Sequence, residues 1–283
     1  MYTLEPKSVA LIGASDDESK LGCSILKNLL ESTYKGEIFP VNPKHTDMMG
    51  KICFASISDI TEIVDLAIIV TPATTVCGIA EECGKKKVKT LVVISAGFGE
   101  LGTDEGRLRE KQLANITLKY NIGLVGPNCL GILRPCIGLN ASFAATPTKA
   151  GSIALISQSG AMAVGLLDRC EENGLGFSLV ASIGNKTMMT ESDFLVICEK
   201  DHETNVIGLY LESIKDGARF IETASRISTK KPIVLLKAGI SLRGAKAVSS
   251  HTGALAGSSA ALDAACANAG IHRALSTDEF LDL

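Results

Sequence analysis

The chain has 283 residues, of which 46% are hydrophobic and 21% are charged, with 27 glycines and 8 prolines. These values exclude a disordered or fibrous protein and predict two folded domains. The 28 basic and 31 acidic residues give a net charge of −3, and tryptophan is absent, so we expect no binding to nucleic acid or to an anionic membrane.

Predicted strands and helices alternate through the first half of the chain. Short β-branched segments bounded by Gly, Ser or Pro alternate with segments of helical period, which is typical of βαβ units and a parallel sheet. Strands are predicted at residues 9–13, 38–41, 66–70, 91–94 and 122–126. Helices are predicted after residue 22, at 74–86 and at 104–120.

The second half repeats this pattern. Strands are predicted at residues 152–157, 178–182, 206–211 and 233–237, with helices near 161–173, 216–228 and 258–269. Residues 133–150 contain Pro135 and Pro147 without periodicity and are predicted to hold the domain boundary. We therefore expect an α/β fold with two doubly wound parallel-sheet domains, at residues 1–140 and 141–283.

The first predicted strand runs into a loop that can present backbone N–H groups to a phosphate. Gly13-Ala14-Ser15 follows the strand, and Lys20-Leu21-Gly22 opens the helix, at the position where doubly wound domains bind nucleotides. A plain strand-to-helix turn would have the same residues. The loop lacks the G-x-G-x-x-G spacing of dinucleotide enzymes, so it leaves the ligand open.

The ends of later strands carry further candidate ligand contacts. Lys44 follows the second strand, where NAD-binding domains place a carboxylate. A cation there suits a phosphate on the ribose, which both NADP and coenzyme A carry, although an idle surface lysine is the alternative. Pro72 and Ser95-Ala96-Gly97 follow the third and fourth strands, either as ligand contacts or as turn residues.

One of the four histidines lies in an unusual loop. His251 falls within residues 244–257, which consist largely of Gly, Ala and Ser. Such a loop can approach a ligand closely or move, although a solvent-facing histidine is the alternative. No two histidines are spaced as a metal-binding pair, so we expect no metal site on this chain.

Two other strand ends in the second half suit phosphate chemistry. Ser159 precedes a predicted helix that begins with Gly160 and Ala161, either as a structural N-cap or as part of an anion cradle. Glu212 ends another strand. If these strand ends share one edge with His251, they supply a nucleophilic imidazole, a carboxylate that orients it and an anion cradle.

The cysteines and the N-terminal residues favour a cytoplasmic protein. Nine cysteines, an odd number without a C-x-x-C pair, are typical of a reducing compartment in which they serve as small buried hydrophobes. The first residues lack the basic region and long apolar run of a signal peptide.

Eight motifs occur in order along nearly the whole chain and carry a family resemblance. They are GAS…KLG (13–22), VNPK (41–44), SAGF (95–98), GPNCLGI (126–132), SQSGA (157–161), SIGNK (182–186), LYLE (209–212) and SHTGALAG (250–257). Together they resemble the α-type half of the NDP-forming acyl-CoA synthetases. This group includes the ADP-forming acetate–CoA ligases and is related to the succinyl-CoA synthetase α subunit.

The resemblance implies a Rossmann-like domain that binds coenzyme A and a flavodoxin-like ligase domain. It implies that phosphate converts acyl-CoA to an acyl phosphate, that His251 then accepts the phosphoryl group while Glu212 orients it, and that ADP finally receives it. The implied phosphate-binding residues are Ser159, Gly160 and Ala161. The implied coenzyme A contacts are Gly13, Ala14, Ser15, Lys20, Gly22, Lys44, Pro72, Ser95, Ala96, Gly97 and Asn128.

The resemblance also implies a partner. In this family ADP, ATP and Mg²⁺ bind to an ATP-grasp module, and the sequence has no glycine-rich clamp or acid pair left over for one. We therefore expect a separate β subunit in a hetero-oligomer, or a fused domain. Two alternatives stay open, namely an NADP-dependent oxidoreductase that uses Lys44, and a non-catalytic acyl-CoA-binding module in which the His251 loop is vestigial.

Overall fold

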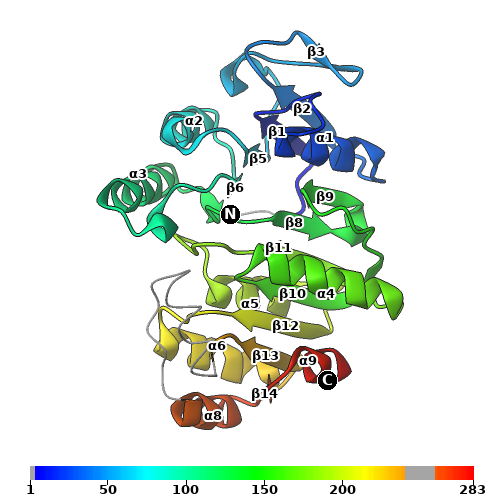
Figure 1. Cartoon of the computed structure of the whole chain (residues 1–283), viewed down its shortest axis with the longest axis vertical. Helices are drawn as coiled ribbons and strands as arrows, with labels where there is room; N and C mark the ends of the chain where they lie inside the picture. Colours follow the sequence, from blue (N-terminus) through cyan, green and yellow to red (C-terminus); the bar gives the residue numbers. More distant parts are fainter. Residues whose placement is uncertain (1–3, 240–258) are drawn as a thin grey trace. The chain divides into compact units, whose positions relative to one another are not determined.

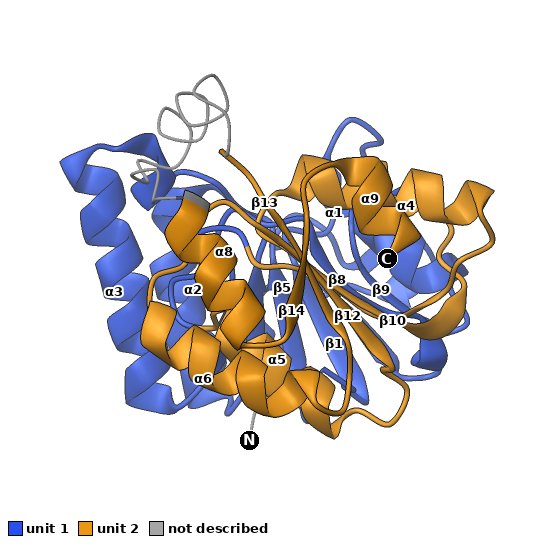
Figure 2. Cartoon of the chain, turned by 90° about the horizontal axis from the view of Figure 1, so that it is seen from below, with its two compact units in different colours: residues 1–145, 184–188 blue, residues 146–183, 189–283 orange. Residues whose placement is uncertain are grey.

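The computed structural model describes residues 4–239 and 259–283 and divides into two compact units (Figures 1 and 2). Unit 1 comprises Met1–Ala145 and Gly184–Met188, and unit 2 comprises Thr146–Ile183 and Met189–Leu283. The division after Ala145 falls just beyond the predicted boundary at residue 140. The short segment Gly184–Met188 belongs to unit 1 although its neighbours in sequence belong to unit 2.

Unit 1 is built on a parallel sheet in the order β2-β1-β5-β6-β7. Its strands are β1 (Ser8–Ile12), β2 (Glu37–Val41), β5 (Leu66–Ile69), β6 (Thr90–Val93) and β7 (Gly123–Val125). Its helices are α1 (Leu21–Glu31), α2 (Ala73–Lys85) and α3 (Asp104–Tyr120). Each predicted strand and helix of this half is present, and the bounds of α3 are those predicted.

The core of unit 1 follows from the alternation of side chains along its strands. Ala10 and Ile12 of β1 join a buried cluster with Val76 and Ala80 of α2 and Leu113 of α3. Intervening strand residues point to the opposite face of the sheet, and α1 packs against β1 there through its buried apolar residues. Helices on both faces leave the carboxyl edge of the sheet to the connecting loops.

The segment predicted to hold the boundary includes part of an antiparallel hairpin that the sequence pattern did not reveal. Strands β8 (Gly131–Arg134) and β9 (Leu139–Ser142) are joined by η3 (Pro135–Ile137). Gly138 ends the turn with φ +72°, and a Cβ there would lie 2.3 Å from Thr33 Oγ1. Pro135 and Gly138, which lie in the predicted boundary segment, therefore make a tight turn between two strands.

Unit 1 also contains short elements that the sequence pattern does not reveal. They are the antiparallel pair β3 (Asp47–Met48) and β4 (Lys51–Ile52), and the 3₁₀ turns η1 (Ile57–Asp59) and η2 (Gly99–Leu101). Each has only two or three residues, too few to show a repeating pattern in the sequence.

Unit 2 has parallel strands in the order β14-β13-β12-β10-β11. They are β10 (Ala150–Ser157), β11 (Phe177–Ser182), β12 (Val206–Leu211), β13 (Ile233–Lys237) and β14 (Ile271–Ala274). Its helices are α4 (Gly160–Glu172), α5 (Glu191–Lys200), α6 (Gly217–Ser228), α8 (Ser259–Asn268) and α9 (Thr277–Asp282). Together the two sheets confirm the predicted α/β class.

Three elements of unit 2 were missed by the sequence prediction. Strand β14 carries His272 and Arg273 between its apolar ends, so it has only two residues of apolar signal. Helix α9 is short. Helix α5 could have been found, because Thr190 and Asp193 form a capping box of the T-x-x-D kind at its start.

The nine cysteines all lie in the described part of the chain and form no disulfide bond; seven are buried, whereas Cys77 is half-buried and Cys136 is exposed. Burial raises the pKa of the Cys129 thiol to about 12, which keeps it protonated and unreactive. In the described residues, no helix combines the length and apolarity that crossing a membrane requires.

The capping box of α5 ties stability to pH. The amide and hydroxyl of Thr190 donate to Asp193 Oδ2 at 2.8 and 2.9 Å, and Arg219 Nη2 donates to Asp193 Oδ1 at 2.5 Å. Burial alone would raise the pKa of Asp193, but the hydrogen bonds from Arg219 and Thr190 outweigh it and hold the pKa below its ordinary value of 3.8.

Replacing Asp193 with asparagine should remove this pH dependence. A carboxyl with a lowered folded pKa stabilises the protein above its unfolded pKa and loses that contribution as the pH falls through the folded value. We expect D193N to be less stable than the unmodified chain by about 1 kcal/mol near neutral pH, and the gap to close as the pH falls below about 4. Urea unfolding near neutral pH and below about pH 4 measures this difference in the free energy of unfolding. A difference of the same size at both pH values would contradict the role given to the Asp193 carboxylate.

Candidate functional site

The predicted ligand contacts of unit 1 lie at one edge of its sheet. Because β1, β2, β5, β6 and β7 are parallel, the loops that follow them leave from the same carboxyl edge. The strand order reverses between β1 and β5, and such a switch point opens the crevice in which doubly wound sheets bind ligands.

The loop after β1 is shaped by two glycines in close contact. Gly13 has φ +92°, and a Cβ at Gly22 would lie 2.1 Å from the carbonyl oxygen of Gly13. The start of α1 can therefore approach the strand end only without a side chain at position 22. Asn42 Nδ2 donates to the carbonyl oxygen of Ala14 at 2.8 Å, so Asn42, which was not predicted as a site residue, positions this loop. Ser15 is buried in it and accepts a hydrogen bond from Asp17 N.

Helices α1 and α2 both begin at this edge without a side-chain cap. Their N-cap residues are Lys20 and Pro72, and neither accepts a hydrogen bond from the helix. Helices α3, α4, α6 and α9, in contrast, are capped by Thr103, Ser159, Asp216 and Ser276. The first two N–H groups of α1 and of α2 thus have no side-chain cap and can bind an anion. The N–H groups of Cys23 and Thr75, the third in each helix, donate to the carbonyl oxygens of Lys20 and Pro72.

The two candidate cations at the edge differ in their surroundings. Lys20 Nζ lies 3.4 Å from Asp17 Oδ2 and is largely exposed. Lys44 is exposed, and its backbone N donates to Asn42 Oδ1 at 3.0 Å. Because Asn42 bonds both Ala14 and Lys44, it links the loop after β2 to the glycine loop.

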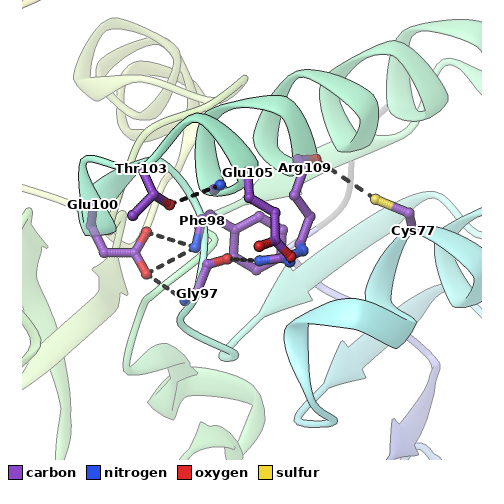
Figure 3. Close-up of polar contacts among 8 residues, drawn as sticks. Cys77, Gly97, Phe98, Glu100, Thr103, Glu105 and Arg109 are labelled. Carbon is purple, nitrogen blue, oxygen red and sulfur yellow. Dashed lines mark hydrogen bonds and ion pairs between the residues drawn. The ribbon is translucent and has the colours of Figure 1, made fainter.

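Hydrogen bonds from other residues of the chain hold the loop after β6 in place (Figure 3). Ser95 Oγ donates to the carbonyl oxygen of Thr71 at 2.5 Å, which ties it to the strand end before Pro72. The N–H of Gly97 donates to Glu100 Oε1 at 2.5 Å, and Arg109 Nη1 donates to the carbonyl oxygen of Gly97. Both polar backbone groups of Gly97 are therefore satisfied without a ligand. Gly97 has φ +108°, and a Cβ at this position would lie 2.9 Å from Ala73 Cβ. Its backbone conformation and this close packing explain why the residue is a glycine.

Ala96 and Asn128 complete the edge. Ala96 is exposed next to the held loop. The backbone N of Asn128 donates to the carbonyl oxygen of Ser95 at 3.0 Å. Asn128 has φ +58°, a conformation that asparagine tolerates better than most residues, so the loop after β7 fixes the position of Ser95.

In unit 2, the end of β10 leads into a capped helix. Ser159 is the N-cap of α4, which begins at Gly160 and Ala161, and its Oγ accepts from Met162 N at 3.4 Å. Ser157 Oγ donates to the carbonyl oxygen of Ser159 at 2.6 Å. The predicted N-cap is confirmed, and the N–H groups of the first turn point beyond the strand edge.

Glu212 lies beside this turn. Gln158 Oε1 accepts the backbone N–H groups of Glu212 and Ser213, both at 2.9 Å, and Lys237 Nζ donates to the carbonyl oxygen of Glu212 at 2.8 Å. The buried Glu212 is thus tied to the loops after β10 and β13. Gln158 and Lys237 were not predicted as site residues, although Gln158 directly follows β10 and Lys237 is the last residue of β13. His251 lies outside the described residues.

No group of three or more His, Cys, Asp or Glu side chains suited to a metal ion occurs within residues 4–239 and 259–283. The helix N-termini at both edges, together with Lys20 and Lys44 in unit 1, suit anionic ligands, and the edge of unit 2 adds the carboxylate of Glu212.

Family models match both halves of the chain. A model described as "CoA binding domain" matches residues 7–135, and one described as "Succinyl-CoA ligase like flavodoxin domain" matches residues 150–283. The chain is 47% identical over 277 residues to acetate–CoA ligase [ADP-forming] I of Archaeoglobus fulgidus, which covers 98% of this chain and 40% of that protein. It is 44% identical over 281 residues to the α subunit of acetate–CoA ligase [ADP-forming] I of Pyrococcus furiosus, with 98% and 61% covered.

The chain belongs to the ADP-forming acetate–CoA ligase family. It corresponds to the α-type portion, with a CoA-binding domain and a succinyl-CoA ligase-like domain, as the motifs predicted. A solved structure of the dinucleotide-forming acetyl-coenzyme A synthetase 1 of Ca. Korarchaeum cryptofilum, in complex with phosphate and ADP, has a TM-score of 0.92 and 41% identity. That match covers 97% of this chain and 59% of the other chain. This family member thus spans less than two thirds of the length of these relatives.

Proposed function

We propose that this chain binds coenzyme A and carries the phosphoryl group in an ADP-forming acyl-CoA synthetase. The overall reaction interconverts acyl-CoA, phosphate and ADP with a carboxylic acid, CoA and ATP. The observation that supports it most is the match of CoA-binding and succinyl-CoA ligase-like domains to the two halves of the chain.

In the first unit, coenzyme A would bind along the carboxyl edge of the sheet. The open N–H groups of α1 and α2 would receive its diphosphate, and Lys20 would add a positive charge beside them. Gly13, Ala14, Ser15 and Gly22 would form the floor of this site, and Lys44 would bind the ribose phosphate. Pro72, Ser95, Ala96, Gly97 and Asn128 would line the remainder.

In the second unit, the chemistry would run in three balanced steps. An oxygen of inorganic phosphate attacks the acyl carbon, and the C–S bond breaks to release CoA and form an acyl phosphate. A ring nitrogen of His251 then attacks phosphorus, and the carboxylate leaves. Finally an ADP oxygen attacks phosphorus and the P–N bond breaks to give ATP. Ser159, Gly160 and Ala161 would cradle the phosphoryl oxygens, and Glu212 would orient the imidazole.

ADP, ATP and Mg²⁺ would bind to an ATP-grasp β subunit or fused domain. The relative from Pyrococcus furiosus is named as an α subunit, which favours a partner of this kind. The test mixes the chain with acetyl phosphate, alone and with an ATP-grasp partner. A phosphoryl group that is labile in acid and stable in base is expected, and no label under either condition would contradict the proposal.

Replacing Lys44 with alanine tests the coenzyme A site. A lysine that pairs with the ribose phosphate should matter only for ligands that carry that phosphate. We expect K44A to raise the Kd for CoA by about tenfold and to leave the Kd for dephospho-CoA unchanged, as measured by calorimetry. Equal effects on both ligands would remove Lys44 from the site, and binding of NADPH in preference to CoA would favour an oxidoreductase instead.

A further inference from the structure

Two carboxylates of unit 1 converge on the loop after β6. Glu100 belongs to η2 (Gly99–Leu101) and Glu110 to α3. Glu100 Oε1 accepts the N–H groups of Gly97 at 2.5 Å and of Phe98 at 3.1 Å. Glu110 Oε2 accepts the N–H of Gly99 at 2.9 Å. Three successive backbone donors of this loop are therefore held by two side chains (Figure 3 shows those of Glu100).

A single amide group joins the two carboxylates. Asn185 Nδ2 donates to Glu100 Oε2 at 2.6 Å and to Glu110 Oε2 at 2.9 Å. Asn185 Oδ1 accepts from Asn128 Nδ2 at 3.3 Å. Asn185 thus offers a donor to each carboxylate, and the other end of its amide bonds the loop after β7. Without that nitrogen, the two carboxylates would lose the donor that they share.

The position of Asn185 is itself tightly determined. Its backbone N donates to the carbonyl oxygen of Pro127 at 3.0 Å, and Thr187 N donates to that of Gly126 at 3.2 Å. Gly184 has φ +51°, and a Cβ there would lie 2.2 Å from Pro127 O. The segment Gly184–Met188 is therefore pressed against the loop after β7 within unit 1.

The loop that these side chains hold lies against the start of α2. A Cβ at Gly97 would come within 2.9 Å of Ala73 Cβ, and Ala73 is the first residue of α2. Ser95, two residues earlier, bonds the strand end before Pro72. A shift of the loop would thus disturb both the open N-terminus of α2 and the wall of the proposed crevice.

Resting on the proposed binding of coenzyme A, we propose that Asn185 is a positioning residue for that ligand. It holds Glu100 and Glu110 together and through them fixes residues 97–99 in the form that the crevice requires. Burial alone would raise the pKa of Glu100, but the hydrogen bonds from Asn185, Gly97 and Phe98 outweigh it and lower the pKa. Glu100 is therefore charged near neutral pH, when the donor from Asn185 is needed.

The experiment replaces Asn185 with aspartate and with alanine in the full chain and measures the Kd for CoA by calorimetry at about pH 8 and about pH 5.5. The Asn185 amide bonds Glu100 from η2 and Glu110 from α3, and the charged residue next to it in sequence, Lys186, is buried. Arg109 of α3 bonds Gly97 and Glu105 instead. In N185D, a third carboxylate joins those of Glu100 and Glu110 and raises the pKa at which this cluster takes up a proton. At the lower pH that proton supplies a donor in place of the lost amide.

We expect N185D to raise the Kd by about tenfold at the higher pH, and by clearly less at the lower pH. N185A should also raise the Kd, but by less than N185D at the higher pH, because alanine removes the donor without adding a third carboxylate. The control is Asn173→Asp, since Asn173 is an exposed C-cap residue of unit 2. N173D should bind CoA like the unmodified chain at both pH values.

Thermal unfolding of each variant distinguishes loss of the folded structure from displacement of the loop at residues 97–99. Folded variants with an unchanged Kd, or an N185D defect that is the same at both pH values, would overturn the inference. Absence of a cooperative transition in both variants would also overturn it, because Asn185 would then determine the fold instead. Failure of the unmodified chain to bind CoA would contradict the proposed function itself.

Discussion

Replacement of His251 with alanine should abolish phosphoryl labelling of the chain and lower turnover of the complete synthetase by about a thousandfold or more. The proposed reaction passes through a covalent P–N bond, and alanine has no atom that could form it. Binding of coenzyme A should stay unchanged, because the proposed CoA contacts lie in the other unit. Labelling with radioactive acetyl phosphate and calorimetry with CoA measure the two properties separately.

The matched control is His202→Ala, since His202 is an exposed histidine that follows α5. H202A should label like the unmodified chain. A label that survives in H251A, or one that resists acid, would place the phosphoryl group on another residue. Binding of CoA without labelling under any condition would instead select the non-catalytic acyl-CoA-binding module.

Replacement of Gly22 with alanine should strongly destabilise the chain, although it adds only one methyl group. The new Cβ would lie 2.1 Å from the carbonyl oxygen of Gly13, a backbone atom that cannot rotate away. We expect a loss of about 2 kcal/mol or more in the free energy of unfolding. Separation of α1 from the end of β1 should also displace the open N–H groups of the helix, so binding of CoA should weaken with it.

Gly165→Ala provides the control for this substitution. Gly165 lies inside α4, and a Cβ there would meet nothing within 4 Å. Because alanine favours helix more than glycine does, G165A should leave stability unchanged or raise it by up to about 1 kcal/mol. Urea unfolding of both variants decides the matter, and equal stability of G22A and the unmodified chain would show that the two glycines can separate without cost.

The regular elements could be predicted because their signal is local. Apolar β-branched runs identified β1 and β12, and helical periodicity identified α3, which the structure shows capped by Thr103 and ended by Asn121. Prediction failed at β14, where His272 and Arg273 interrupt the apolar run, and at the hairpin β8–β9, which lies in the segment around Pro135 that showed no periodicity. Where the local signal is this weak, pairing with the neighbouring strand decides the conformation.

The candidate contacts with a nucleotide or phosphate could also be proposed from residue types, since Gly, Ser and Lys at strand ends have recognisable uses. Which backbone groups remain open could not be foreseen. Gly97 was expected to face a ligand, yet its N–H and carbonyl groups are bonded to Glu100 and Arg109. Those partners lie 3 and 12 residues away, and nothing in the spacing of the motif indicates them.

The β-branched runs, the helical periodicity and the motifs were enough to establish two α/β halves, most of their strands and the family resemblance, because each is a property of a short stretch of the sequence. Only the folded chain decided the strand order, the approach of Gly22 to Gly13 and the placement of Asn185 between Glu100 and Glu110, 85 and 75 residues away in sequence. Contacts of that kind form when distant loops leave the same edge of a sheet, so their energy depends on the path of the whole chain.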